Sequence, residues 1–88
     1  MTNKKPLISV IISAYNAEKK IEKCILALLN QTYNPIEIII VDDGSTDRTK
    51  KIIQKFLGDK RIFLLEQKRN GPGAAKNLAS KKANGKIL

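Results

Sequence analysis

Short continuous apolar runs alternate along the chain with longer segments in which apolar residues recur every three or four positions. Continuous runs rich in isoleucine and valine are typical of strands buried on both faces, whereas the recurring pattern indicates amphipathic helices. The apolar runs occupy residues 7–13, 36–41 and 61–66, and a fourth begins at residue 86. The helical segments occupy residues 16–31, 45–58 and 74–84.

This alternation predicts an α/β fold, with a parallel sheet of about four strands, helices on both faces and right-handed crossovers. We expect a single domain over residues 1–88 that is truncated at its fourth strand, because the chain stops three residues into that strand. Ligands of such open sheets bind outside the carboxyl ends of the strands. The segments expected there are residues 13–16, 42–47 and 69–77.

The ends and faces of the predicted helices follow from their local residues. The first helix has an apolar stripe made of Ile21, Cys24, Ile25, Leu28 and Leu29. Cys24 is therefore predicted to be a buried core thiol rather than a nucleophile. Asn16 is a suitable N-cap for this helix, and Ser45 or Thr46 for the second, because their short polar side chains accept hydrogen bonds from free backbone amides. Gly58 suits the end of the second helix.

The amino-acid composition excludes some kinds of catalytic and metal-binding site. Hydrophobic residues make up 42% and charged residues 28% of the chain, which is typical of a folded globular protein. A single cysteine and no histidine nearly exclude zinc sites and histidine-based catalysis, and they favour a reducing, cytoplasmic location. The net charge of +9 favours anionic partners, although a lysine-rich solvated surface explains it equally simply.

Two adjacent acids follow the second predicted strand. Asp42 and Asp43 can accept hydrogen bonds from a ribose or a base, or they can simply form a turn before the next helix. Tyr15 can stack on a base or cover the edge of the sheet. Lys68 and Arg69 can hold phosphates or remain solvated. The glycine fingerprints of dinucleotide-binding and P-loop proteins are absent.

Four motifs occur in order along nearly the whole chain. They are the strand end "SAYN", the helix end "LLNQTY", the segment "EIIIVDDGSTD" and the glycine-rich "NGPGAAKN". In this combination the chain resembles the amino-terminal half of an inverting, family-2 glycosyltransferase. The resemblance implies a three-layer, Rossmann-like GT-A half-domain that binds a nucleotide-diphosphate sugar, with UDP as the expected nucleotide.

The resemblance also implies roles for individual residues. The family's counterpart of Asp43 accepts a hydrogen bond from the base, and Asp42 supports the same loop. Lys76 stands where the family commonly has arginine, near the base and phosphates, and lysine lacks the planar fork needed for a bidentate contact. The implied nucleotide-binding residues are Ser13, Ala14, Tyr15, Asp42, Asp43 and Lys76.

Other elements of the family are expected beyond Leu88. These are the Asp-x-Asp site for a divalent metal, Mn²⁺ or Mg²⁺, and the carboxylate that activates the acceptor hydroxyl. We therefore expect no metal ligand and no catalytic residue in this chain, and no sugar transfer by it alone. The expected partner is a nucleotide-diphosphate sugar and not a nucleic acid, with contact at the inner face of a membrane.

Two further expectations concern the surface. An exposed edge at the first or fourth strand is a template for pairing with another chain, which predicts a homodimer. A competing hypothesis is a small, basic, non-catalytic α/β module that binds nucleic acid or an anionic membrane. Salt-dependent binding would support that hypothesis, but aromatic residues make up only 5% of the chain.

Overall fold

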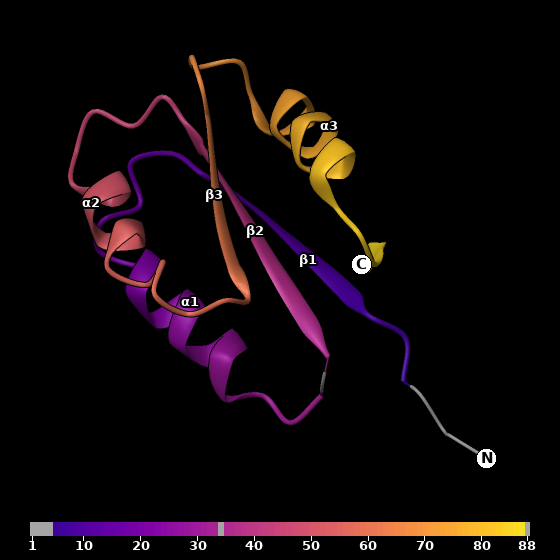
Figure 1. The fold of residues 1–88 in the computed structure, drawn as a ribbon. Helices are drawn as coiled ribbons and strands as arrows, with labels where there is room; N and C mark the ends of the chain where they lie inside the picture. The colour runs from indigo at the N-terminus through magenta and orange to yellow at the C-terminus, as the bar shows by residue number, and fades with distance from the viewer. Residues whose placement is uncertain (1–4, 34, 88) are drawn as a thin grey trace.

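A four-stranded parallel sheet lies between two helices on one face and one helix on the other (Figure 1). The computed structural model describes residues 5–33 and 35–87. The predicted α/β architecture is confirmed. In chain order the elements are β1 (Ile8–Ala14), α1 (Ile21–Asn30), β2 (Ile36–Asp43), α2 (Thr49–Gln54), β3 (Ile62–Gln67), α3 (Pro72–Lys82) and β4 (Lys86–Ile87).

The strand order β3-β2-β1-β4 places β2 in the interior of the sheet. All eight residues of β2 are buried, which explains why five of its first six residues are apolar. Successive side chains of a strand point to opposite faces. In β2, Ile38 and Ile40 accordingly pack in the core beneath α1 and α2, while Ile39 and Val41 pack toward α3.

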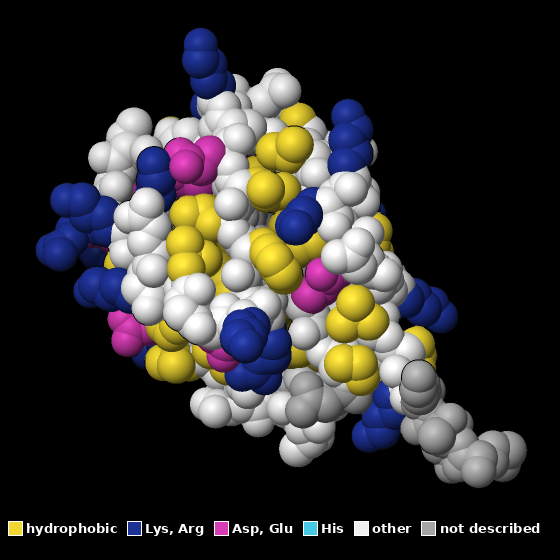
Figure 2. All heavy atoms as spheres, viewed as in Figure 1, with side chains coloured by type: hydrophobic (Ala, Val, Ile, Leu, Met, Phe, Trp, Pro, Cys, Tyr) yellow, Lys and Arg dark blue, Asp and Glu magenta, His cyan; other side chains and the backbone are white. Residues whose placement is uncertain are grey.

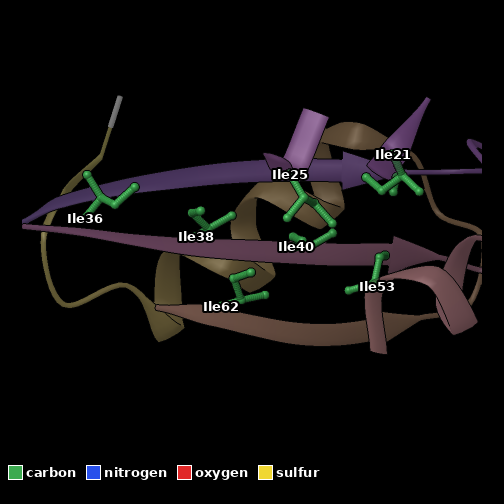
Figure 3. Close-up of a cluster of buried hydrophobic side chains, with 8 residues drawn as sticks. Ile21, Ile25, Ile36, Ile38, Ile40, Ile53 and Ile62 are labelled. Atoms are coloured by element: carbon green, nitrogen blue, oxygen red, sulfur yellow. The ribbon is translucent and has the colours of Figure 1, made fainter. Parts of the chain in front are cut away.

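The larger core consists mainly of isoleucines (Figure 3). Ile21 and Ile25 of α1 and Ile53 of α2 pack there against the strands. On the other face, Ala75 and Ala79 of α3 are fully buried against the sheet. Their small side chains allow close approach of the helix to the sheet.

The first helix differs from its prediction in two ways. It begins at Ile21 rather than after Asn16, so Asn16 is not its N-cap. Asn16 instead has a positive φ of 47°, and its side chain bonds to another loop. Cys24 is exposed, so the prediction of a buried thiol is wrong. It lies about 100° around the helix from Ile25, at the margin of the face that covers the sheet.

The other two helices also differ at their ends. The prediction that Ser45 or Thr46 caps α2 is wrong: the helix begins at Thr49, whose N–H donates to the Asp47 carboxylate at 2.9 Å. After Gln54 the chain continues as turns, so the regular helix does not reach the predicted end at residue 58. The third helix begins at Pro72, where the fixed φ of proline suits the first turn.

The sheet edges are formed by β3 and β4. Within the described residues, β4 pairs with β1 only at Ile8 and Ser9, so residues 10–14 of β1 have no strand on that side. The predicted homodimer through such an edge stays a prediction. No helix within residues 5–33 and 35–87 has both the length and the apolar character needed to cross a membrane.

Positive charge is spread over the surface. On the face seen in Figure 2, Lys and Arg side chains lie at separate places, both at the margin and nearer the middle, with apolar side chains between some of them. The basic side chains seen on this face therefore do not form one continuous patch.

Just before β4, the chain at Gly85 passes very close to the backbone of Leu7. A Cβ added there would lie 2.6 Å from the carbonyl oxygen of Leu7, and the next residue, Lys86, donates its N–H to that same oxygen at 2.8 Å. We expect Gly85→Ala to lower the free energy of unfolding by about 1–3 kcal/mol, because the neighbouring backbone must shift. Urea denaturation followed by circular dichroism measures this change.

Gly58→Ala is the matched control, because no atom lies within 4 Å of the added Cβ. It should change stability by less than about 0.5 kcal/mol. Equal effects of the two substitutions would contradict the proposed steric cause.

Candidate functional site

Three loops meet at the carboxyl edge of the sheet, as parallel strands require. They follow β1, β2 and β3, and we call them the first, second and third loops (residues 15–20, 44–48 and 68–71). Hydrogen bonds join the first loop to the second and the end of β2 to the third. The segments expected to carry the chemistry therefore do lie together.

The two aspartates at the end of β2 face opposite sides of the sheet. Asp42 lies in register with Glu66, whose carboxylate pairs with Lys50 of α2 at 2.8 Å, so Asp42 is on the α2 side. It accepts a hydrogen bond from the Ser45 N–H at 3.3 Å, within its own loop. Asp43 is on the α3 side. The adjacent acids are therefore separated by the strand and do not form one binding pair.

Asp43 is fully buried and holds the third loop in place. One carboxylate oxygen accepts hydrogen bonds from the Gln67 side chain at 2.9 Å and from the Asn70 N–H at 2.7 Å. The other accepts from the Gly71 N–H at 3.0 Å and from the Arg69 guanidinium. The bonds from Gln67 and Asn70, supported by those from Arg69 and Gly71, lower the pKa of Asp43 to about 2. The side chain is thus an anion at neutral pH.

Gly44 allows the second loop to pass against the third. Its φ is +73°, and a Cβ at this position would lie 2.7 Å from the backbone nitrogen of Arg69. Any other residue would meet both a strained backbone and a clash with backbone atoms. The glycine after the two aspartates is therefore required by the packing of the loops.

Arg69 links the first loop to β2. Its guanidinium carbon lies 3.7 Å from the centre of the Tyr15 ring, and the same guanidinium pairs with the buried Asp43. The Arg69 side chain is 54% exposed and Tyr15 is 41% exposed, so both are accessible to a ligand. From the sequence, Arg69 was a candidate only for holding phosphates, and its contacts with Tyr15 and Asp43 were not predicted.

The remaining predicted residues lie on β1, in the third loop and on α3. Ser13 is exposed and lies in register with Val41. Ala14 is buried beneath α1, so only its backbone can face a ligand. Lys76 is exposed in the first half of α3. Lys68 is exposed in the third loop.

The site provides an aromatic ring, a guanidinium and a buried anion, which suits a planar base with N–H donors. It does not suit a divalent metal. The part of the chain that the structure describes has no group of three or more acids, cysteines or histidines. The two neighbouring aspartates point apart, and both oxygens of Asp43 already accept hydrogen bonds.

Comparison with known proteins agrees with these features. A family model described as glycosyl transferase family 2 matches residues 9–88. An uncharacterized glycosyltransferase of Haemophilus influenzae is 48% identical over 85 residues, covering 94% of this chain and 34% of that protein. The chain thus spans about a third of that relative.

Two solved structures share the fold. The mannosyltransferase PcManGT from Pyrobaculum calidifontis, in complex with GDP-Man and Mn²⁺, has a TM-score of 0.87 and 29% identity; the match covers 94% of this chain and 26% of that one. Residues 1–349 of S. aureus TarS, in complex with UDP-GlcNAc, have a TM-score of 0.84 and 35% identity, with 92% and 25% covered. The resemblance that the four sequence motifs carried is confirmed: the chain belongs to glycosyl transferase family 2.

Proposed function

We propose that this chain binds the nucleoside of a nucleotide-diphosphate sugar, with UDP as the nucleotide, for glycosyl transfer to an acceptor hydroxyl. The observation that carries this proposal is the arrangement of Tyr15, Arg69 and Asp43 at the carboxyl edge of the sheet. The solved structures that contain UDP-GlcNAc and GDP-Man support the class of ligand.

Each of these three side chains has a distinct role. The exposed ring of Tyr15 offers a surface on which the base stacks. Asp43 accepts only, so it selects a base that presents an N–H. Arg69 is the half-exposed partner of Asp43 and gives way when the base N–H takes its place. The other bonds to Asp43 come from two backbone amides and a β3 side chain, and they keep the carboxylate oriented.

The diphosphate lies beyond these residues. Lys76, exposed on α3, supplies positive charge on that side of the sheet. A divalent metal, when bound by the complete enzyme, neutralises the departing nucleotide diphosphate. The described residues contain no group of three or more acids, cysteines or histidines that could hold this metal. We therefore expect this chain to bind nucleotide and not to transfer sugar alone.

Calorimetric titration with UDP and GDP tests this proposal. We expect Tyr15→Ala to weaken UDP binding by roughly 5- to 150-fold, the range that corresponds to the loss of one base–aromatic stack. Tyr15→Phe keeps the ring and should bind like the unchanged protein. The proposal fails if neither nucleotide binds, or if Tyr15→Ala binds UDP as tightly as Tyr15→Phe.

The competing hypothesis of a polyanion-binding module gains no support. The positive side chains are dispersed in Figure 2, and the residues at the sheet edge combine an anion with an aromatic ring rather than a run of cations. Weak UDP binding combined with strong, salt-dependent binding of RNA would favour that hypothesis instead.

A further inference from the structure

A set of hydrogen bonds joins the first loop to the second loop and the start of α2, and the nucleotide site described above does not use it. These bonds connect residues that are 29 to 32 positions apart in the sequence. We call the residues whose side chains take part the loop bridge. They are Asn16, Glu18, Ser45, Thr46, Asp47 and Thr49.

Asn16 bonds reciprocally with the second loop. Its N–H donates to the Ser45 hydroxyl at 2.9 Å, and its side-chain carbonyl accepts the Thr46 N–H at 2.8 Å. The backbone of Asn16 is left-handed, with φ 47°, a conformation that asparagine tolerates better than most residues. The chain therefore turns sharply directly after Tyr15, and the second loop holds that turn.

Thr49 forms the buried end of the bridge. It is fully buried, and its hydroxyl accepts the Ala17 N–H at 2.7 Å. The same hydroxyl donates to the Asp47 carboxylate at 2.5 Å, and that carboxylate oxygen also accepts the Thr49 N–H. Asp47 thus fixes the direction of the hydroxyl, which leaves a lone pair of Thr49 for Ala17.

Glu18 and Asp47 each accept a hydrogen bond from a backbone amide of the other loop. The Glu18 N–H donates to Asp47 at 3.3 Å, and the Glu18 carboxylate accepts the Arg48 N–H at 3.0 Å. Three consecutive backbone amides of the first loop, at residues 16–18, therefore donate to side chains of residues 45–49. The first loop takes its shape from the second.

We infer that the loop bridge is a positioning device, which holds Tyr15 with its ring against Arg69 and ready for the base. In this role its members hold the loop and affect the nucleotide through the position of Tyr15. They explain why a "GSTD" segment follows the two aspartates although neither Ser45 nor Thr46 caps α2. The part that concerns nucleotide affinity rests on the proposed function, whereas the placement of Tyr15 does not.

Thr49→Val tests the bridge, because it removes the hydroxyl and keeps the shape of the side chain. Three properties are measured: NMR signals of the Tyr15 ring and Arg69 guanidinium, hydrogen exchange of the Ala17 amide, and UDP affinity. We expect the Tyr15 and Arg69 signals to shift and Ala17 to exchange faster. UDP binding should weaken by roughly 5- to 10-fold, the factor for one lost hydrogen bond.

Two controls separate positioning from a general loss of stability. Thr49→Ser keeps the hydroxyl and should restore the Tyr15 signals and the UDP affinity. Ile53→Val trims a fully buried side chain of the same helix outside the bridge. It should lower the melting temperature while leaving the Tyr15 signals and the UDP affinity unchanged.

An exposed variant keeps the inference testable if Thr49→Val does not fold. Asn16→Gly tolerates the positive φ but loses the carbonyl that accepts the Thr46 N–H, whereas Asn16→Asp keeps an acceptor oxygen. We expect the Tyr15 signals to shift in the glycine variant and to stay near their original positions in the aspartate variant.

Specific results would overturn the inference. They are unchanged Tyr15 signals in both Thr49→Val and Asn16→Gly, or failure of Thr49→Ser to restore them. If the unchanged protein binds neither UDP nor GDP, the proposed function fails, and the Tyr15 and Ala17 measurements still decide the positioning role.

Discussion

Replacing Asp43 with asparagine is expected to weaken UDP binding by roughly two orders of magnitude. The asparagine amide presents a donor where the carboxylate now accepts four hydrogen bonds, and the charge that pairs with Arg69 is lost. The third loop then loses the anion that holds it. Calorimetry of the variant with UDP measures the binding change.

Asp59→Asn is a matched control for this substitution. Asp59 also has its pKa lowered to about 2, first by hydrogen bonds from the Arg61 side chain and backbone. Asp59 precedes β3, so it lies at the amino ends of the parallel strands. Asp43 ends β2, so it lies at their carboxyl ends. We expect Asp59→Asn to leave UDP affinity unchanged. An equal loss of affinity in both variants would show that the effect is not specific to the site.

The lowered pKa of Asp43 also predicts a pH dependence. An ordinary aspartate in an unfolded chain titrates near pH 4, and the folded value is about 2. The stabilisation from Asp43 is therefore fully present above about pH 4 and is lost as the pH falls toward 2. In urea denaturation over this range, the difference in stability between the protein and Asp43→Asn should shrink with falling pH. A difference that stays constant would contradict this assignment.

The second large effect is expected at Glu37, a buried carboxylate at the other end of β2. It is 5% exposed, and one of its oxygens accepts the Asn84 N–H at 2.6 Å, the Gly85 N–H at 3.1 Å and the Ser9 hydroxyl. These groups connect β1, β2 and the segment that leads into β4. Burial raises the pKa of Glu37, but the hydrogen bonds from Ser9, Asn84 and Gly85 outweigh burial and lower it overall.

We expect Glu37→Ala to lower the free energy of unfolding by about 2–4 kcal/mol, because buried donors lose their acceptor. Such a loss is a large fraction of the total stability of a domain of this size. Glu37→Gln keeps one acceptor oxygen and should cost less. Urea denaturation followed by circular dichroism measures both variants. Since the folded pKa is lowered, the contribution of Glu37 is present above the unfolded pKa and is lost as the pH falls.

Glu66→Gln is the matched control for Glu37. Glu66 pairs with Lys50 at 2.8 Å, but its side chain is 55% exposed. Exposed ion pairs contribute little, so stability should change by less than about 0.5 kcal/mol. If Glu37→Ala cost no more than Glu66→Gln, the buried hydrogen bonds would not be stabilising the join between β1 and β4.

Local patterns predicted part of the site as well as the fold. The apolar run of β2 and the motif that follows it located Asp43 at the carboxyl edge of the sheet. The period of two along a strand also implies that Asp42 and Asp43 face opposite sides of the sheet. Arg69 was predicted only as a possible phosphate ligand, because its partners, Tyr15 and Asp43, lie far away in the sequence.

The helix ends also show a difference between what local residue patterns predict and what distant contacts decide. Asn16, Ser45 and Thr46 have the chemistry of capping residues, and local propensity assigned them to that role. In the folded chain their polar groups bond to one another across two loops. Cys24 was placed in the core because the apolar stripe was read as wider than the face of α1 that meets the sheet.

The sequence by itself determined the order of strands and helices, the buried character of β2 and the family, because these depend on periodicity and on motifs whose residues are near neighbours. Only the tertiary structure decided the partners of Asp43, the stacking of Arg69 on Tyr15 and the bridge between the first two loops. Those contacts join residues 24 to 54 positions apart, and they exist because the parallel strands bring their carboxyl ends to one edge.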